Sequence, residues 1–387
     1  MNRSKQTERY RQDEFQRSDV NDESKTKSIS EIKMRKCLLA SAVLVPLIGT
    51  ANAQSSVTLA GIIDGGIGFR TGASANNSTQ WAFQSGAVQT SQIVFSGTED
   101  LGAGYSAYFY LASGFLLGNG AYTNARLPAS AGTYMFDRGA WVGLRGSFGS
   151  VQLGRSFTPL ADVLYRSDAS GYANFASLSN TIYQNLTGIT GAQYTWSNNA
   201  IKYISPTFGG LSAELMQSLG GVAGDFAAGR VRSAAIFYTY GPFALNGAYL
   251  DANDPGGTSD DKLVARSFTV GAVYTGDHFK VSLNAANFKN PVLDTNQTFY
   301  SLGGTYHLSP VNDIVADYTF LADKVAARDG SYFKLGIHHY LSKLTDLYAE
   351  GGIARNHSKG QVGIASVFPS SPGINQTGLM IGVRHFF

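Results

Sequence analysis

Residues that could carry chemistry are few in this sequence, and their spacing does not form a catalytic or metal site. The stretch Gly102–Gly104, with Ala107 after it, has part of the spacing of a dinucleotide-binding turn, but it follows an acidic turn and opens a strand instead of a helix. His338 and His339 are adjacent, so a strand points them to opposite faces and they cannot share one metal ion. No motif groups a serine with a histidine, as a hydrolase requires. We therefore expect no enzyme activity, no cofactor and no metal site.

The composition of the chain narrows the class of protein. Of its 387 residues, 15% are charged and 12% are aromatic, and 45 are glycine. Low charge together with many aromatic residues argues against a disordered chain. No window contains the roughly 18 consecutive apolar residues of a membrane-spanning helix. The sequence therefore excludes a helical membrane protein, and the pattern of the remaining residues has to decide the fold.

The first 53 residues are predicted to lie outside the fold. Residues 1–33 are rich in both charges and poor in apolar side chains, so they cannot form a core; we interpret them as a non-native or disordered extension. The basic residues Arg35 and Lys36, the apolar run from Cys37 to Ile48, and the Ala51–Ala53 cleavage motif then predict a signal peptide at 34–53. We expect cleavage after Ala53, with Ala51 and Ala53 as the small residues of the site.

Removal of this segment balances the charge of the chain. Residues 1–53 hold ten of the 30 Lys and Arg residues and seven of the 27 Asp and Glu residues, which leaves twenty of each. A basic surface for nucleic acid is therefore not expected.

Residues 54–387 show a two-residue period typical of β-strands. Between Val57 and Phe69 the odd positions are mostly apolar and the even positions are mostly small or polar. The same alternation recurs at 267–274, 279–286, 333–338 and 379–384. Such segments predict strands with one apolar face and one polar face.

The connections between these segments alternate between short and long. Short turns are predicted at 99–104, 147–150, 206–210, 241–242, 275–278, 308–313 and 341–345. Longer polar stretches are predicted near 71–90, 116–135, 156–198, 220–230, 252–265, 289–298, 326–331 and 354–376. Seven turns and eight loops join sixteen strands of about 8–13 residues, and about 9–11 tilted residues cross a bilayer.

This alternation of short turns and long loops predicts an all-β, 16-stranded antiparallel transmembrane β-barrel with short periplasmic turns and long extracellular loops. Closure pairs every backbone group and leaves no open edge, as lipid requires. The alternative is a large soluble all-β protein such as a propeller or a lectin, but a propeller would repeat at about 40 residues. The sequence shows no such repeat.

Six segments carry a resemblance to a known family. They are SVTLAGII at 56–63, FSGTEDLGAG at 95–104, DRGAWVGLRGSFGSVQLGR at 137–155, AIKYISPTFGGL at 200–211, YLSKLTDLYAE at 340–350 and GLMIGVRHFF at 378–387. In these segments the chain resembles the Gram-negative trimeric porins, in their β-proteobacterial branch. The resemblance implies a homotrimer of barrels, each with its own water-filled pore, and a third loop that folds inward and narrows it. That loop corresponds to about 156–196.

The resemblance also assigns residues to the narrowed part of the pore. In the family, acidic residues on the third loop oppose basic residues on the wall; here Asp162 and Asp168, with Tyr165, are the loop candidates. Arg138 and Lys202 are the wall candidates. A third wall arginine is expected where this chain has Gln92, so the preference for anions or cations stays open.

Charges facing each other across a narrow aqueous gap would orient solutes, and the width of the gap would set a size limit. Arg70, Arg145, Arg155 and Arg166 are candidates for further pore charges; alternatively they anchor strand ends in lipopolysaccharide phosphates or form ion pairs within loops. Aromatic residues on strands are interpreted as facing lipid or forming the aromatic girdle: Tyr238, Tyr240, Tyr274, Trp141 and Phe299.

The end of the chain resembles the assembly signal of outer-membrane barrels. Phe387 is the terminal residue, and Val383, Ile381 and Leu379 share its face of the last strand. The resemblance implies that the barrel assembly machinery recognises this strand.

The function predicted from the sequence is a water-filled outer-membrane channel for the passive diffusion of small hydrophilic solutes and ions. Lipid and lipopolysaccharide of the outer membrane are the expected surroundings, after export through a cleaved signal peptide. The alternatives are a non-conducting barrel that serves adhesion or structural anchoring, and a substrate-specific channel.

Overall fold

A computed structural model describes residues 56–123, 134–185, 194–253, 264–291, 294–325, 327–365 and 370–387. The predictions made for residues 1–33 and 34–53, including Ala51 and Ala53, lie outside this part of the chain.

The described residues form one sheet of seventeen strands, all paired antiparallel, and two helices. The strands are β1 (Ser56–Arg70), β2 (Gln80–Ser85), β3 (Gln92–Gly102), β4 (Tyr105–Gly114), β5 (Gly139–Gly146), β6 (Gly149–Phe157), β7 (Trp196–Ile204), β8 (Leu211–Ser218), β9 (Val231–Tyr240), β10 (Phe243–Asn253), β11 (Val264–Thr275), β12 (Phe279–Asn290), β13 (Thr295–Ser309), β14 (Asn312–Asp323), β15 (Gly330–Tyr340), β16 (Thr345–Asn356) and β17 (Gln376–Phe386). The helices are α2 (Pro159–Ser167) and α3 (Leu178–Asn185). Within the described ranges, no helix is both long enough and apolar enough to cross a membrane.

The sheet closes on itself between its first and last strands. From β3 onward each strand pairs with the next in the chain, and β17 pairs with β1 from Phe386 opposite Ile62 to Gly378 opposite Arg70. The other edge of β1 pairs with β3 at residues 56–62 and with β2 at residues 65–70. Because β2 and β3 occupy successive parts of one position, the barrel has sixteen strand positions, as the sequence predicts.

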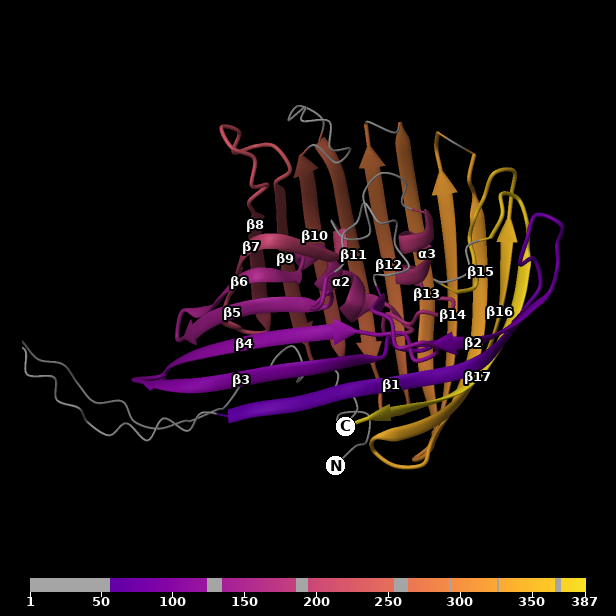
Figure 1. Cartoon of the computed structure of the whole chain (residues 1–387), viewed down its shortest axis with the longest axis horizontal. Coiled ribbons are helices and arrows are strands. Elements are labelled where there is room, and N and C mark those ends of the chain that lie inside the picture. Colours follow the sequence, from indigo (N-terminus) through magenta and orange to yellow (C-terminus); the bar gives the residue numbers. More distant parts are fainter. Residues whose placement is uncertain are drawn as a thin grey trace, which may run out of the picture. The chain divides into compact units, whose positions relative to one another are not determined.

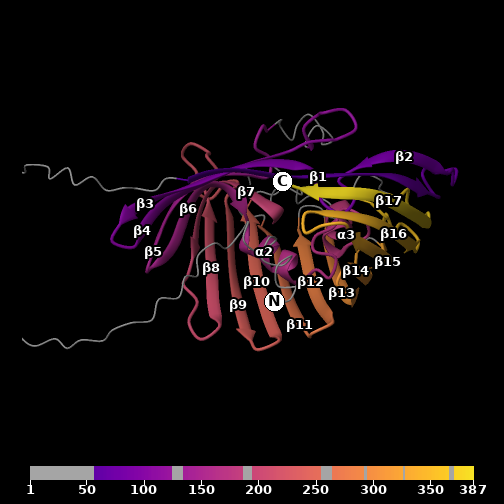
Figure 2. The same cartoon turned by 90° about the horizontal axis from the view of Figure 1, so that it is seen from below.

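The two walls of the barrel cross, and the helices lie between them. Figure 1 shows β1 and β3–β6 in front at a steep angle to β9–β15 behind, as strands tilted in opposite walls of a barrel must be. Figure 2 gives the view from below, in which α2 and α3 again lie between the front and back strands.

The alternation of the strands places apolar side chains outside and polar side chains inside. On β15, Phe333, Leu335 and Ile337 are 45–53% exposed, whereas Lys334 is 0% and His338 is 4% exposed. This arrangement is inverted relative to a water-soluble protein and matches the lipid-facing wall of an outer-membrane barrel. The predicted faces of the strands are confirmed.

The short turns also agree with the prediction, whereas one predicted loop is partly a strand. Each of the seven predicted short turns spans the junction between two consecutive strands of the structure, although some of the predicted ranges overlap the strand ends. The stretch 71–90 contains β2, in which the exposed Trp81 and Phe83 continue the outer apolar face opposite β1. The prediction missed β2 because its six residues are too short to show a clear period.

Two aromatic residues predicted to face outward lie inside. Phe299 is fully buried and packs edge-on against Phe288, with 5.8 Å between ring centroids. Trp141 stacks on the buried Tyr110, with 5.5 Å between centroids. Phe299 belongs to a buried cluster that includes the third-loop residues Leu164 and Leu178, and Trp141 packs against residues of β3 and β4. The strand pattern alone does not reveal this environment. Tyr238 and Tyr240 are exposed, as expected for the outer face.

Candidate functional site

The third loop connects β6 and β7; its described residues, 158–185 and 194–195, lie inside the barrel and begin with a capped helix. The Thr158 hydroxyl accepts a hydrogen bond from the backbone N–H of Ala161, and Pro159 follows at the first helical position, where its missing N–H costs nothing. Leu160 and Leu164 are fully buried, and α2 contacts the inner faces of β9, β10 and β11. The helix is therefore bound to the inside of the wall.

Small residues on the wall let the loop approach closely. A Cβ at Gly271 on β11 would overlap the side chain of Ser167, at the end of α2. Similarly, a Cβ at Gly303 on β13 would lie 2.6 Å from the Cβ of Ala169. The Asn284 side-chain amide donates to the Ser167 hydroxyl at 2.6 Å. Glycine is required at these positions because the loop occupies the space that a side chain would fill.

The second helix of the loop joins another connection inside the barrel. The backbone N–H of Ala176 donates to the carbonyl oxygen of Ile364 at 2.6 Å, and the Asn180 amide donates to the carbonyl oxygen of Gly363 at 3.4 Å. Leu178 and Ile182 on α3 are fully buried. Gly363 and Ile364, in the connection between β16 and β17, thus contact and support the third loop.

Four charged side chains meet where α2 touches the wall. The Lys202 ammonium on β7 contacts the Asp162 carboxylate of α2 and lies 2.9 Å from Oε2 of Glu214 on β8. The Arg166 guanidinium lies 3.7 Å from Oε1 of Glu214 and stacks over the Phe237 ring at 3.9 Å. The structure thus brings the predicted residues Lys202 and Asp162 together as a contact pair, whereas the sequence predicts that they face each other across a gap.

These four side chains differ in how far solvent reaches them. The side chains of Lys202 and Glu214 are each 4% exposed and that of Asp162 is 10% exposed, whereas the side chain of Arg166 is 30% exposed. Buried ion pairs neutralise each other and are screened little by salt. Arg166 is therefore the charge of this cluster that solvent reaches most readily.

Asp168 lies at the end of α2 and is buried. Its carboxylate accepts a hydrogen bond from the backbone N–H of Ser170 at 2.9 Å and a longer one from that of Ser179 at 3.4 Å. Burial raises the pKa of the Asp168 carboxyl above its ordinary value, against these hydrogen bonds and the charge of Lys334, which lower it. The carboxyl group holds the turn after α2 and is not exposed to the lumen.

A row of aromatic rings connects Tyr165 to the start of β7. The ring centroids of Tyr165 and Tyr172 are 5.9 Å apart, those of Tyr172 and Phe157 6.4 Å, and those of Phe157 and Trp196 5.0 Å. Burial raises the pKa of Tyr172 to about 12, so its hydroxyl stays protonated. Tyr165 therefore belongs to a packed row of rings at the base of the loop.

Two predicted arginines flank the end of this row. The guanidinium carbons of Arg138 and Arg155 lie 5.0 and 5.7 Å from the centroid of the Trp196 ring. Arg138 pairs with Asp137 at 3.6 Å, and Arg155 donates to the Asn198 side chain at 2.6 Å. Both guanidinium groups are held by neighbours on the barrel, and the Arg138 side chain is 22% exposed.

Comparison with known proteins identifies the family to which this barrel belongs. Residues 40–360 match the family model described as Gram-negative porin. The chain is 31% identical to outer membrane porin protein 32 of Delftia acidovorans over 371 residues, which cover 92% of this chain and all of that protein. The chain belongs to the Gram-negative porin family.

Other relatives agree with this assignment. An outer membrane porin protein of Bordetella pertussis is 26% identical over 92% of this chain and all of its own length. The solved structure of an anion-selective porin from Comamonas acidovorans superposes on 86% of this chain and all of its own, with a TM-score of 0.74 and 26% identity. The trimer form of OmpT of Vibrio cholerae shares the fold, with a TM-score of 0.62 at 15% identity. This porin is thus an outer-membrane channel protein of the 16-stranded type.

The porin carries a second charged cluster that the sequence analysis did not single out. The Lys334 ammonium lies 3.3 Å from Oε1 of Glu350 and donates to the Phe175 carbonyl oxygen of the third loop at 3.2 Å. His338 bridges Glu350 and Asp346 at 3.3 and 2.9 Å. Arg384 on β17 contacts the same Asp346 through Nε at 2.9 Å.

All five side chains of this cluster are at most 4% exposed. The alternation of β15 and β17 already indicates that Lys334, His338 and Arg384 share the polar face, and this parity could have identified them. Their partners on β16, Asp346 and Glu350, lie beside them because of the register between the strands, which the sequence does not give. Within the described ranges, no three His, Cys, Asp or Glu side chains are arranged to hold a metal ion.

The remaining predicted pore residues of this porin lie apart from the third-loop cluster. Gln92 begins β3 opposite Ile62 and is half-buried on the inner face. Arg145 lies near the short turn that ends β5, with its guanidinium 5.2 Å from the Tyr108 ring centroid. Arg70 ends β1 and donates to the Gln80 side chain at 2.9 and 3.1 Å.

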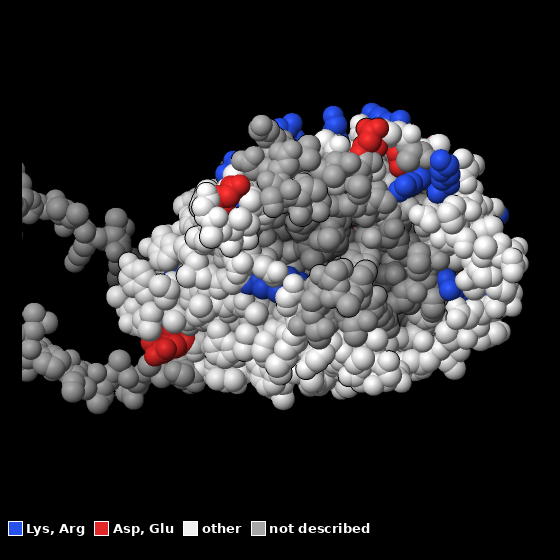
Figure 3. All heavy atoms as spheres, turned by 45° about the horizontal axis from the view of Figure 1, so that its top comes forward, with Lys and Arg blue, Asp and Glu red and all other residues white. Residues whose placement is uncertain are grey.

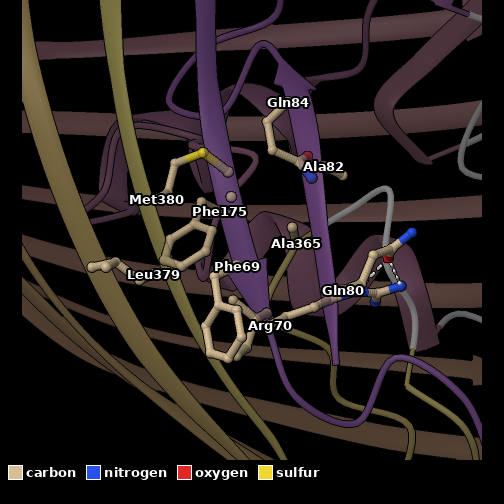
Figure 4. A pocket seen from close by; sticks show the side chains of 11 residues that line it. Phe69, Arg70, Gln80, Ala82, Gln84, Phe175, Ala365, Leu379 and Met380 are labelled. Carbon is tan, nitrogen blue, oxygen red and sulfur yellow. Dashed lines mark hydrogen bonds between the residues drawn. The ribbon is translucent and has the colours of Figure 1, made fainter. Parts of the chain in front are cut away.

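Arg70 and Gln80 border a small pocket between β1, β2 and β17, closed on one side by Phe175 of the third loop (Figure 4). Most of its lining is apolar, including Phe69, Leu379 and Met380. Figure 3 looks onto the face at the top of Figure 1; that face is hollowed, and Lys and Arg side chains lie along part of its rim.

The residues predicted as the assembly signal lie together on the outer surface of the porin. Leu379, Ile381, Val383 and Phe387 are 39–58% exposed. The backbone of Phe387 exchanges two hydrogen bonds with Gly61 on β1, at 3.0 and 3.1 Å. The end of the chain therefore closes the barrel; its recognition during assembly stays a prediction.

Proposed function

We propose that this porin is a diffusion channel for small hydrophilic solutes and ions whose narrowest part is formed by the third loop against β7–β12. The observation that carries this proposal is the attachment of α2 to the inner wall by Lys202, Asn284 and buried apolar side chains. A loop bound in this way reduces the cross-section at a fixed depth, which sets a size limit for solutes.

We further propose a preference for anions at this narrow part. Lys202 and Arg166 together balance the charges of Asp162 and Glu214, and the Arg166 guanidinium is the most exposed of the four groups. A cationic group beside a narrow aqueous path attracts anions and repels cations. The anion-selective porin from Comamonas acidovorans, which has the same fold, is consistent with this preference.

Other features of the mature protein are proposals that rest on the sequence and the family. We infer export through a cleaved signal peptide at 34–53, assembly as a homotrimer through the barrel assembly machinery, surroundings of outer-membrane lipid and lipopolysaccharide, and no catalytic role. The trimer form of OmpT supports the oligomeric state by fold alone. N-terminal sequencing of the mature protein tests the processing: we expect Gln54 first, and a start before residue 34 would contradict it.

Liposome swelling tests the size limit directly. Liposomes containing the purified porin should swell in small sugars and progressively less in larger ones. Replacement of Arg166 by Gln should leave this size series unchanged and reduce the anion preference in a KCl gradient. An unchanged reversal potential would contradict the assignment of anion preference to Arg166, whereas an absence of swelling by the unmodified porin would contradict the channel itself.

A further inference from the structure

The connection between β2 and β3 is too long to remain in the wall of the barrel. On the shared edge of β1, Ile62 pairs with Gln92 and Gly65 pairs with Ser85. Two residues of β1 therefore face six residues of the connection, 86–91, which we call the inner segment. The four additional residues cannot be accommodated in a regular ladder.

The inner segment folds toward the interior of the barrel. Ala87 and Val88 are each only 4% exposed and belong to the same buried apolar cluster as Leu164, Phe175 and other residues of the third loop. The inner segment therefore occupies space inside the barrel beside β1.

Asp64 of β1 holds the inner segment in this position. Its carboxylate accepts hydrogen bonds from the backbone N–H groups of Val88 and Gln89 at 2.9 and 2.6 Å, and its own carbonyl oxygen accepts from the N–H of Gly86 at 2.7 Å. Ser91 binds the backbone N–H and carbonyl of Asp64 at 3.0 and 3.1 Å. Asp64 is fully buried and provides the hydrogen bonds that an interrupted ladder would lack.

The inner segment also contacts the third loop and the second charged cluster. The Asn174 side-chain amide of the third loop donates to the Gly86 carbonyl oxygen at 2.6 Å and to the Thr90 hydroxyl at 3.1 Å. On the other side, Arg384 donates to the Gln89 side chain at 3.4 Å. The inner segment thus lies between the third loop and the charged wall of β16 and β17.

We propose that residues 86–91 are an additional inward element of the pore, positioned by Asp64, which narrows the channel beside β1 and fixes the third loop through Asn174. This inference rests on the proposed constriction by the third loop and adds a further determinant of pore width. Asp64 acts as a positioning residue, because its carboxylate is fully engaged with the inner segment and with the Tyr348 hydroxyl at 2.7 Å.

The direct test shortens the connection to the length that the ladder requires. Replacing residues 86–91 by Thr-Val keeps Gln92 on the inner face and lets β2 and β3 pair continuously with β1. Single-channel conductance should rise, and liposome swelling should extend to larger sugars. A folded, heat-modifiable variant with unchanged conductance and size limit would overturn the proposal. The unmodified porin measured in the same bilayers reports separately on the channel function.

Point variants test the proposal if the shortened chain does not fold. Asp64→Ala removes the carboxylate oxygen that accepts from the N–H groups of both Val88 and Gln89, so we expect a higher conductance and greater fluctuation of the open-channel current. Asn174→Ala should increase the fluctuation through the third loop. Tyr348→Phe is the matched control, because it removes only the hydrogen bond on the far side of Asp64, and it should behave as the unmodified porin does. Equal effects of Tyr348→Phe and Asp64→Ala, or no effect of Asp64→Ala and Asn174→Ala, would refute the role of the inner segment.

Discussion

Lys202 on β7 and Asp162 on α2 are in direct contact, so the wall of this porin and its third loop are joined by a buried ion pair. Glu214 on β8 completes the group at 2.9 Å from the same ammonium. One lysine thus binds carboxylates from two elements, and Arg166, 3.7 Å from Glu214, supplies the second positive charge of the cluster.

Neutralisation of Asp162 should increase the preference for anions. In Asp162→Asn, Lys202 keeps only Glu214 as an anionic partner, so the local potential becomes more positive. A unit charge acting across about 8 Å of water changes the energy of an anion and of a cation by about 0.5 kcal/mol each, with opposite signs, so the anion-to-cation permeability ratio changes by about 1 kcal/mol, or about fivefold. Reversal potentials in a KCl gradient measure this ratio. Glu99→Gln, at the exposed short-turn end of β3, is the control and should leave it unchanged.

Removal of the lysine should instead weaken the attachment of the loop. Lys202→Met leaves Asp162 buried without a cation and Glu214 with Arg166 alone, and breaking a buried pair in this way typically costs about 3–5 kcal/mol. We expect a lower temperature for loss of the folded barrel on heat-modifiability gels. Addition of Asp162→Asn and Glu214→Gln to this variant should restore most of the loss. If Lys202→Met melts as the unmodified porin does, the ion pair does not stabilise the loop.

Asp168 should confer a pH dependence on stability and contribute little to selectivity. Its pKa is higher in the folded protein than its ordinary value of about 3.9, so its contribution to stability is greatest below that value and is lost as the pH rises through the raised pKa. Asp168→Asn should therefore match the unmodified porin in acid and exceed its melting temperature increasingly as the pH rises. A gain that is largest in acid would contradict this sign, and a changed reversal potential would show that the carboxylate faces the pore.

The glycine beneath α2 should be sensitive to substitution. Gly271→Val places a branched side chain where Ser167 lies, so α2 must move away from β11. We expect a changed single-channel conductance in a folded barrel. Gly247→Ala on β10 is the control, because the nearest atoms lie 3.8 Å from its added Cβ. Equal conductance of Gly271→Val and the unmodified porin would mean that this contact does not set the width of the pore.

Much of the barrel can be predicted from the sequence because each strand must satisfy lipid on one face and the lumen on the other. The alternation of Phe333, Lys334 and Leu335 therefore identifies both the strand and its faces. β2 is different because it is short and because its pairing with residues 65–70 of β1 requires residues 86–91 to fold toward the interior of the barrel. Long-range contacts of this kind leave no local period in the sequence.

The site is less predictable than the strands for the same reason. The resemblance places Lys202 on the wall and Asp162 on the loop, but their contact depends on how deeply α2 enters the barrel. Phe299 is a second example. It lies on the inner face of its strand and is buried by residues of the third loop, and the two-residue period of the strand does not predict this burial. His338, Asp346 and Glu350 meet through the register of β15 and β16, which a single sequence does not fix.

Conductance in planar bilayers tests the central claim most directly. The purified, folded porin, added to one side of a membrane under a KCl gradient, should produce stepwise openings and a reversal potential that favours chloride. Stepwise openings would show an open, water-filled lumen, and a potential that favours chloride would agree with Arg166 as the most exposed charge of the cluster. Absence of current from folded, heat-modifiable protein would contradict the account and point to a plugged barrel that serves adhesion or anchoring.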